Sequence, residues 1–386
     1  MTSRRHRSQS AAPLENDDLL SEILLRLPPQ PSSLPRASLV NKRWHRLASD
    51  PGFLRRFRIH HRRSPPILGC FVEDVDDISF LPTLEAPNRV PPGRLSLQSA
   101  NEDRSRLLSC RHGLVLIYNR ALRQLLVWDP ITGDQHHVAI PSVFNNTTEV
   151  TGAVLRAGKD VQHFKVVCVV TCFDAIQSAL ACVYSPETSL WGEAVSTPIP
   201  RLYIFDTRIS WVQPAVLVGD ALYWLLTGSL CGILEFDIEV NSLDVIPFPV
   251  DVFGHEFTVT RTYSGALGFL RVSKFTAQLW ESKTDCDGVA SWELGITIEL
   301  DKLLSLNPME LQPVIQGFAE DNNVVILSTM AGRFAVQLQP LQFKNLPQTD
   351  VKTYFHPFES VYTTDIGGER DKAKQFSKVQ GLVRYA

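Results

Sequence analysis

A strand-and-turn unit that recurs along the chain is the feature that most constrains the fold. Its clearest copy reads as three apolar strands within 113–118, 125–133 and 137–141, and the second of these segments ends in a Pro-x-Thr-Gly turn. Short runs of Val, Leu, Ile and aromatic residues bounded by Gly, Pro and Asp are typical of antiparallel sheets. The unit recurs with anchor residues at Trp128, Tyr184, Phe236, Trp280 and Leu338.

The spacing of these anchors indicates the architecture. Successive anchors lie 44–58 residues apart, which is near the ~40–50 residues of a four-stranded propeller blade and too long for the common helical repeats. Residues 65–386 accommodate about six such units. Because a closed ring protects sheet edges that an open array would expose, we predict a β-propeller of six blades, with five or seven as alternatives.

The amino-terminal segment has helical periodicity instead. Residues 17–27 form an amphipathic helix, with Asn16 to cap it and Pro28 to stop it. At 100° per residue, its apolar side chains fall on one arc of about 140°: Leu19, Leu20, Ile23, Leu24 and Leu27. Leu25 falls on the opposite, polar face, where a solvated helix would place a charge.

Two more short helices follow, from 33 and from 41, and the sequence Asp50-Pro51-Gly52 ends the second of them. Three helices of about ten residues are too small to bury these apolar side chains alone. Either they pack on the carboxy-terminal part of the chain, or they leave an apolar patch of the kind that marks a protein–protein contact.

Charge and composition set further limits. Residues 1–63 hold 13 Lys or Arg against 5 Asp or Glu, whereas residues 64–386 hold 25 against 36, so two different segments join near 64–66. The 44% apolar content is ordinary for a globular protein. No apolar run reaches the ~18 residues of a membrane span, and the first ten residues lack the apolar core of a secretory signal. We expect no membrane association and a cytoplasmic or nuclear location, where the seven cysteines stay reduced.

The helical segment resembles a known family. The stretches LENDDLLSEILLRLP at 14–28, SLPRASLVNKRW at 33–44 and DPGF at 50–53 are similar to an F-box of the plant type. The resemblance implies that three helices dock on the SKP-type adaptor of a cullin–RING ubiquitin ligase. Two positions depart from the pattern: Glu15 replaces the usual proline, and Asn41 replaces the usual cysteine, although Asn is a good helix N-cap. Carried over by position, the adaptor-facing candidates are Leu14, Leu19, Leu20, Ile23, Leu24, Leu27, Pro28, Leu34, Val40 and Trp44.

The rest of the chain resembles the F-box-associated propellers of the grass F-box family, on phrases such as CRHGLVL at 110–116 and IELDKLLSL at 298–306. Residues 300–306 read as a short helix between strands. The predicted fold is therefore α+β and multidomain, a small three-helix F-box followed by an all-β propeller of about six blades. The predicted segments are a disordered basic tail at 1–12, the F-box at 13–58, a linker at 59–66, the propeller at 67–365 and a charged tail at 366–386.

The sequence lacks the common motifs for catalysis and cofactor binding. The chain has no Gly-x-Ser-x-Gly and no phosphate-binding loop with its Lys, and its paired Asp residues at 74–77 and 285–287 suit turns. Its histidines and cysteines lack metal-ligand spacing. We predict no catalytic residue, no metal and no cofactor. Basic clusters at 4–7 and 55–63 fit solvated surface better than nucleic-acid binding or nuclear import.

Together these features predict a non-catalytic substrate receptor of an SCF-type ubiquitin ligase. The F-box would hold the SKP-type adaptor and, through it, cullin, while the propeller would bind an unidentified target protein. The alternative is a non-ligase scaffold that uses the F-box for docking. A propeller glycosidase would instead need a deep central pocket with two facing carboxylates ~5–10 Å apart.

Overall fold

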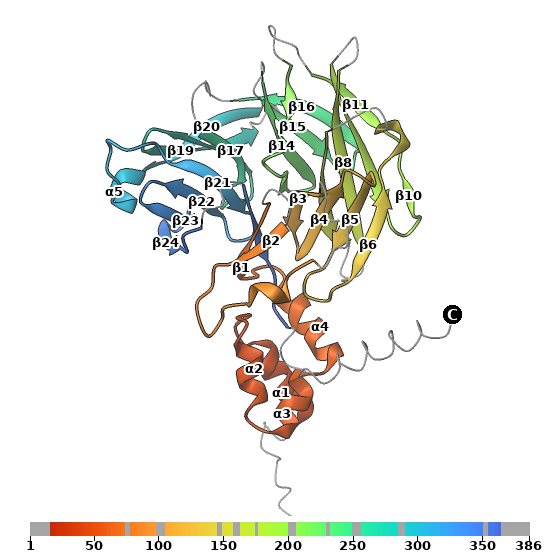
Figure 1. Cartoon of the computed structure of the whole chain (residues 1–386), viewed down its shortest axis with the longest axis vertical. Helices are drawn as coiled ribbons and strands as arrows, with labels where there is room; N and C mark the ends of the chain where they lie inside the picture. Colours follow the sequence, from red (N-terminus) through yellow and green to blue (C-terminus); the bar gives the residue numbers. More distant parts are fainter. Residues whose placement is uncertain are drawn as a thin grey trace, which may run out of the picture. The chain divides into compact units, whose positions relative to one another are not determined.

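The computed structural model describes residues 16–73, 78–97, 105–144, 149–156, 163–173, 177–199, 206–228, 232–248, 256–284, 290–349 and 354–363. It divides into two compact units (Figure 1). The described part of the helical unit comprises 16–66, 85–88 and 361–363, and the propeller unit lies within 67–84 and 89–360. The boundary at residue 66 lies where the charge of the sequence changes sign. The short pieces 85–88 and 361–363 join the helical unit although the sequence interpretation had placed them in the propeller.

The helical unit contains the three predicted helices, and a capping side chain begins the first and the third of them. The Asn16 carboxamide oxygen accepts hydrogen bonds from the backbone N–H groups of Asp18 and Leu19. The Asn41 oxygen does the same for Arg43 and Trp44, so its replacement of the usual cysteine provides a cap. The helices are α1 (Asp17–Leu25), α2 (Ser33–Ser38) and α3 (Lys42–Ala48).

A fourth helix, α4 (Pro51–His60), was not predicted. Asp50 caps it by accepting from the backbone N–H of Phe53, and Pro51 occupies its first turn, where the missing N–H is not needed. Its fully buried side chains, Phe53 and Phe57, are spaced i, i+4 and so lie on one face. Arg55, Arg56 and Arg58 occupy much of the rest of the helix, so its narrow apolar face gives only a weak helical periodicity in the sequence.

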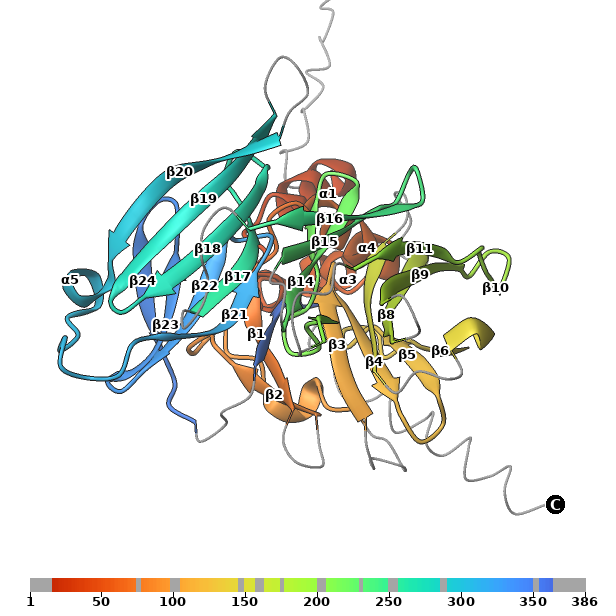
Figure 2. The same cartoon turned by 90° about the horizontal axis from the view of Figure 1, so that it is seen from above.

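The described strands of the second unit form six sheets, and the unit is a six-bladed β-propeller (Figures 1 and 2). The blades follow in chain order, and we number them from the first complete sheet. Blade 1 contains β3 (Ser105–Arg111), β4 (Leu114–Asn119), β5 (Gln124–Trp128) and β6 (Gln135–Ala139). Blade 2 contains β7 (Val150–Arg156), β8 (Phe164–Cys172), β9 (Ser178–Ser185), β10 (Leu190–Trp191) and β11 (Val195–Pro198). Blade 3 contains β12 (Arg208–Ile209), β13 (Val216–Val218), β14 (Ala221–Thr227), β15 (Gly232–Asp237) and β16 (Ser242–Pro247). Blade 4 contains β17 (Glu256–Arg261), β18 (Leu267–Ser273), β19 (Thr276–Thr284) and β20 (Ala290–Glu299). Blade 5 contains β21 (Val314–Ala319), β22 (Val324–Thr329), β23 (Gly332–Gln337) and β24 (Gln342–Leu346). Blade 6 contains β1 (Ile67–Glu73), β2 (Ile78–Pro82) and β25 (Phe355–Glu359).

The repeat read from the sequence is confirmed. Four anchors lie on β5, β9, β15 and β19, each the third strand of its sheet counted outward from the innermost strand, and Leu338 directly follows β23, the corresponding strand of blade 5. The ring closes in blade 6, where β25 pairs antiparallel with β1 from the other end of the unit (blue beside orange in Figure 1). The rings of Phe71 and Phe358 pack across this junction, with centroids 5.3 Å apart. The first and last strands of the propeller unit thus belong to one sheet, and their pairing closes the ring of blades.

The apolar core of the propeller lies between neighbouring blades. Inner strands such as β7 and β14 are buried along almost their whole length, whereas outer strands such as β6 and β24 are mostly exposed. One core cluster joins residues of blades 1 and 2, and another joins blades 3, 4 and 5. A single blade would therefore expose both apolar faces, and only the ring buries them.

Shorter elements complete the structure. The predicted short helix is present as α5 (Leu300–Leu304), at the periphery next to β19 and β20 (Figure 2). Two short 3-10 turns are η2 (Pro92–Arg94) and η3 (Ser142–Phe144). None of the helices in the described ranges has the length and apolar character that a membrane crossing requires.

Candidate functional site

The helical unit presents large apolar side chains to solvent on α1 and on the α2–α3 link. On α1, Leu19 and Ile23 are 49% and 42% exposed, and their i, i+4 spacing places them on one side of the helix. On the link, Leu39 and Val40 are 84% and 59% exposed. We call these four residues the apolar stripe. A unit of this size with four such side chains in solvent has the surface of a protein-binding module.

An ion pair links the two elements that flank the stripe. Arg43, three residues after Val40, donates from Nε to the Asp17 carboxylate at 2.6 Å, and Asp17 lies two residues before Leu19. The start of α3 therefore lies beside the start of α1. The two exposed pairs of the stripe thus lie next to neighbouring elements of the unit.

The structure sorts the ten predicted adaptor-facing residues into groups. Leu19, Ile23, Pro28 and Val40 are exposed, and Leu27 and Trp44 are half-buried. Leu20, Leu24 and Leu34 are at most 2% exposed and form the core of the unit, so they support the surface and offer little of it to a partner. Leu14 lies outside the described residues. Contact between any of these residues and an adaptor stays a prediction.

The exposure of Leu39 was not predicted, whereas the unusual position of Leu25 was visible in the sequence. Leu39 is the most exposed member of the stripe. It lies on the predicted second helix, and nothing in the sequence distinguishes it from the leucines of the core. Leu25, on the polar face of α1, is only 6% exposed because it joins the cluster of Phe53 and Phe57 of α4. The position of Leu25 was the one sequence signal that a further element covers that side.

In the propeller, charged residues occupy equivalent places at one end of the innermost strands. Arg111 ends β3, Arg156 ends β7, Arg261 ends β17 and Glu359 ends β25, while Glu320 directly follows β21. We call these five residues the charge ring. Since the innermost strands of successive blades lie side by side, the strand ends that carry these residues lie around the centre of the propeller.

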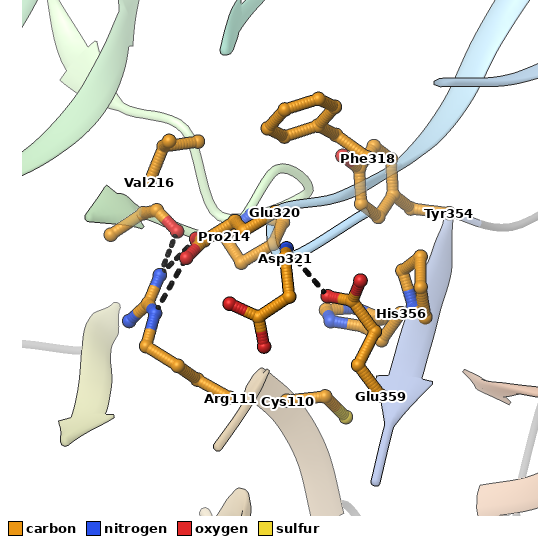
Figure 3. A pocket seen from close by; sticks show the side chains of 12 residues that line it. Cys110, Arg111, Pro214, Val216, Phe318, Glu320, Asp321, Tyr354, His356 and Glu359 are labelled. Atoms are coloured by element: carbon orange, nitrogen blue, oxygen red, sulfur yellow. Dashed lines mark hydrogen bonds and ion pairs between the residues drawn. The ribbon is translucent and has the colours of Figure 1, made fainter. Parts of the chain in front are cut away.

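The ring connects the blades through buried polar contacts. Arg111 forms a two-pronged ion pair with Glu320 of blade 5, with Nε···Oε2 at 3.0 Å, and donates to the Ala215 carbonyl of blade 3 at 2.5 Å (Figure 3). Arg261 of blade 4 donates to the Glu320 carbonyl at 2.7 Å. Arg156 of blade 2 reaches back to blade 1, where it donates to the Asp129 carboxylate at 2.8 Å.

Glu359 connects the closing strand to this network. Its carboxylate accepts from the backbone N–H of Asp321 at 3.1 Å (Figure 3). It also accepts from the backbone N–H of Asn322 at 2.8 Å and from the Asn322 side-chain amide at 2.7 Å. Burial, reinforced by the nearby Asp321 carboxylate, raises the pKa of Glu359 to about 8. Near neutral pH the structure therefore favours the protonated form of this side chain.

Neighbouring groups around the same small cavity are also kept uncharged. Burial lowers the pKa of His356 to about 3, so the imidazole is neutral at physiological pH. Burial likewise raises the pKa of the Cys110 thiol well above its ordinary value. The predicted packing role of the cysteines fits Cys168, which is fully buried in the core between blades 1 and 2.

The central cavity has too little room for a substrate. It measures about 20 Å³, enough for one water molecule. Carboxylates of Glu320, Asp321 and Glu359 line it, but no sugar ring could enter between them. The described residues also contain no group of three or more His, Cys, Asp or Glu arranged to hold a metal ion. The charged residues around this cavity connect blades 1, 3, 4 and 5.

Family comparisons agree with both units. Residues 106–333 match the family described as "F-box protein AT5G49610-like, beta-propeller", and residues 17–60 match the F-box-like family. The second match ends at the last residue of α4, so the helix that was not predicted belongs to this module.

Similar proteins are known from Arabidopsis thaliana. The chain is 27% identical to "Putative F-box protein At3g16210" over 241 residues, which cover 61% of this chain and 60% of the relative. It is 31% identical to "Putative F-box protein At1g47765", over 43% of this chain and 41% of that one. With "Putative F-box protein At3g10240" the identity is 23%, over 85% and 82%. The chain thus spans less than two thirds of the length of the first two relatives.

Among solved structures, similarity is weaker. The beta-propeller domain of Cps50 (Swd1) from Myceliophteria thermophila aligns with 74% of this chain and 87% of its own, at 11% identity and a TM-score of 0.38. The WD40 domain of SCAP from fission yeast aligns with 67% and 56%, at 9% identity and a TM-score of 0.33. Scores this low add nothing to what the sheets themselves establish.

Proposed function

Because the chain belongs to the F-box protein AT5G49610-like β-propeller family, we propose that it is the target-recognition subunit of an SCF-type cullin–RING ubiquitin ligase. The helical unit binds an SKP-type adaptor, and the propeller binds the protein to be modified. The chain itself makes and breaks no bond. Its effect on rate is positional, because it raises the effective concentration of a target lysine near the ubiquitin-charged enzyme.

The observation that supports this proposal most directly is the apolar stripe of Leu19, Ile23, Leu39 and Val40. Solvent exposure of four large apolar side chains is unfavourable by about 25 cal/mol per Å² of apolar surface, and a protein partner removes that penalty. The stripe lies within the residues of the F-box-like match. An adaptor that covers it would meet apolar contacts at the centre and the polar pair Arg43–Asp17 beside them.

Substitution of Ile23 tests the adaptor contact. Ile23→Ala is expected to weaken adaptor binding by about 2 kcal/mol, roughly 30-fold in Kd, because a central apolar anchor is lost. The chain offers a matched control in Ile59 of α4, which is equally 42% exposed but lies outside the stripe. Ile59→Ala should leave the affinity unchanged. The measurement is a calorimetric titration of a plant SKP-type adaptor into the full chain, with circular dichroism to verify that both variants fold.

Trp44 is a less decisive choice although it was predicted together with Ile23. It is half-buried and packs against the core cluster of the unit, so Trp44→Ala would mix lost contact with lost stability. Equal affinity for Ile23→Ala and the unmodified chain would contradict the adaptor proposal. Equal losses for Ile23→Ala and Ile59→Ala would point to a general effect on the helices.

A second measurement separates the ligase from a non-ligase scaffold. If the chain is a ligase subunit, cullin should copurify with it through the adaptor, and Ile23→Ala should remove cullin and adaptor together. A complex that contains the adaptor and never contains cullin would instead favour the scaffold.

A further inference from the structure

A second cavity of the propeller lies between blades 1 and 2, far larger than the central one. It measures about 460 Å³, within the ~300–1,000 Å³ of ligand pockets. Strands β4 and β5, the turn after β5 and the start of β6 contribute one side, and the end of β7 and the start of β8 contribute the other. Its lining residues are Leu114, Val127, Asp129, Asp134, Gln135, His136, Arg156 and Phe164.

The floor of this cavity is a fixed ion pair. Asp129 and Arg156 have side chains only 8% and 9% exposed and are joined at 2.8 Å. The other Asp129 oxygen accepts from the backbone N–H groups of Ile131 and Thr132, and Arg156 Nε donates to the His112 carbonyl at 2.7 Å. Because these charges balance each other and are held by further bonds, the floor supplies shape and rigidity rather than net charge.

The wall and the rim differ in character. The wall is apolar, formed by the buried side chains of Leu114, Val127 and Phe164, and the His136 ring packs on Phe164 with centroids 5.3 Å apart. The rim carries the exposed Asp134. The Thr132 hydroxyl donates to the Asp134 carboxylate at 2.8 Å and orients it, and no cation pairs with it among the described residues. A ligand therefore meets an apolar slot with one oriented, unbalanced negative charge at its mouth.

We propose that this cavity binds a lysine or arginine side chain of a partner protein. The aliphatic stem would lie along Leu114, Val127 and Phe164, and the cationic head would reach Asp134, an arrangement that such amphipathic side chains suit. The charge of the surrounding sequence agrees, because residues 64–386 hold 36 Asp or Glu against 25 Lys or Arg. That excess steers a basic segment toward the propeller and disfavours an acidic one. The inference rests on the proposed role of the propeller in target binding.

A peptide selection tests this assignment. The probe is a phage-displayed library of random twelve-residue peptides, selected on the full chain at low salt. Selected peptides should share one Lys or Arg, and replacement of that residue by norleucine should abolish most of their affinity. Asp134→Asn should weaken binding roughly fivefold, and the charge reversal Asp134→Lys should weaken it at least tenfold.

The chain provides a matched control for these variants. Asp220 also lies in an exposed turn of the propeller, between β13 and β14, and is not part of the cavity lining. Asp220→Asn should leave peptide affinity unchanged. Thermal melts of all three variants should coincide with that of the unmodified chain, because Asp134 and Asp220 are exposed.

Two results would overturn the assignment. One is a set of selected peptides without a shared basic residue, and the other is a shared basic residue whose contribution survives Asp134→Lys. Adaptor binding, measured in parallel, keeps the two proposals separate. A chain that retains the adaptor but shows neither the basic residue nor the Asp134 effect would refute the cavity assignment alone.

Discussion

Replacing Glu359 by glutamine should stabilise the propeller above neutral pH and change it little in mild acid. Glutamine keeps the shape of the side chain and, like the protonated carboxyl group, one carbonyl oxygen. That oxygen can accept from the Asn322 groups that bond to Oε1, whereas the glutamine NH2 replaces Oε2, the acceptor of the Asp321 N–H. The substitution removes the negative charge, which the folded state disfavours because of burial and because of Asp321. The closing strand β25 and the turn after β21 would then remain joined through Asn322 without the cost of a buried charge.

The sign follows from the direction of the pKa shift. The pKa of Glu359 is about 8 in the folded chain against 4.5 for an ordinary glutamate. The folded state thus binds this proton more tightly, and the resulting stability is complete below about pH 4.5 and is lost as pH rises through about 8. At about 1.4 kcal/mol per pH unit, the shift corresponds to a ceiling of about 5 kcal/mol. Because Glu359 keeps some solvent access, we expect about 2 kcal/mol at pH 9.

The assay is urea unfolding of both proteins at pH 5, 7 and 9, followed by the fluorescence of the propeller tryptophans. Glu359→Gln should match the unmodified chain at pH 5 and exceed its free energy of unfolding at pH 9. Glu239→Gln, in the exposed turn after β15, serves as the control and should show no pH-dependent difference. A Glu359→Gln variant that is destabilised equally at every pH would refute the reasoning, since it would show that the carboxylate is stabilising when ionised.

Three further predictions concern stability. Arg111→Met should destabilise the propeller by about 3–5 kcal/mol in urea unfolding, because the Glu320 charge stays buried without its partner, and the double variant with Glu320→Met should recover much of the loss. Asn41→Ala should lower the stability of the helical unit by about 1 kcal/mol through loss of the α3 cap, which thermal circular dichroism would detect. Phe57→Ala should cost about 3–5 kcal/mol in the same measurement, and a loss below 1 kcal/mol would show that α4 is not part of the core.

Much of the fold was predictable because its signals are local. The repeated unit includes an apolar strand that ends near a polar turn. Anchors such as Trp128 and Trp280 on these strands therefore reveal the length of the repeat and the approximate number of blades. The sequence predicted that the ring closes, because open sheet edges are unfavourable, but it did not identify the strands that close it. The residues that close it, in β1 and β25, lie at opposite ends of the propeller sequence and share no motif that would pair them.

The surface of the helical unit was harder to predict than its helices. Leu19 and Leu20 are neighbours on the same apolar arc, yet one is exposed and the other is fully buried. The arc is wider than the face that the other helices cover, and the position of those helices decides which edge of it stays in solvent. The periodicity of α1 therefore predicts that both leucines are apolar contacts and says nothing about which of them faces a partner.

The charge ring could not be predicted before the blades were assigned, for a related reason. Arg111 and Glu320 are 209 residues apart, and in the sequence each is an ordinary charged residue next to a strand. Only the equivalence of strand ends in a closed ring brings them together. Once the blades were assigned, the recurrence of Arg at the ends of β3, β7 and β17 was a usable signal, because an arginine at an inner position needs an acidic partner.

The charge ring and the apolar stripe place energetically costly groups in opposite ways. In the propeller, charges are buried with partners at the centre, which fixes the blades relative to one another and keeps the cavity between blades 1 and 2 in one shape. In the helical unit, apolar side chains are left in solvent without partners, which makes the unit ready for association. A receptor that raises the local concentration of its target increases the rate of modification most when it holds the target in a defined orientation. A rigid ring of blades supports the cavity in the way that this role requires. On this reasoning, the double change Arg156→Met with Asp129→Asn should weaken peptide binding at the cavity, because it removes the fixed floor without leaving an unpaired carboxylate that would attract a cation.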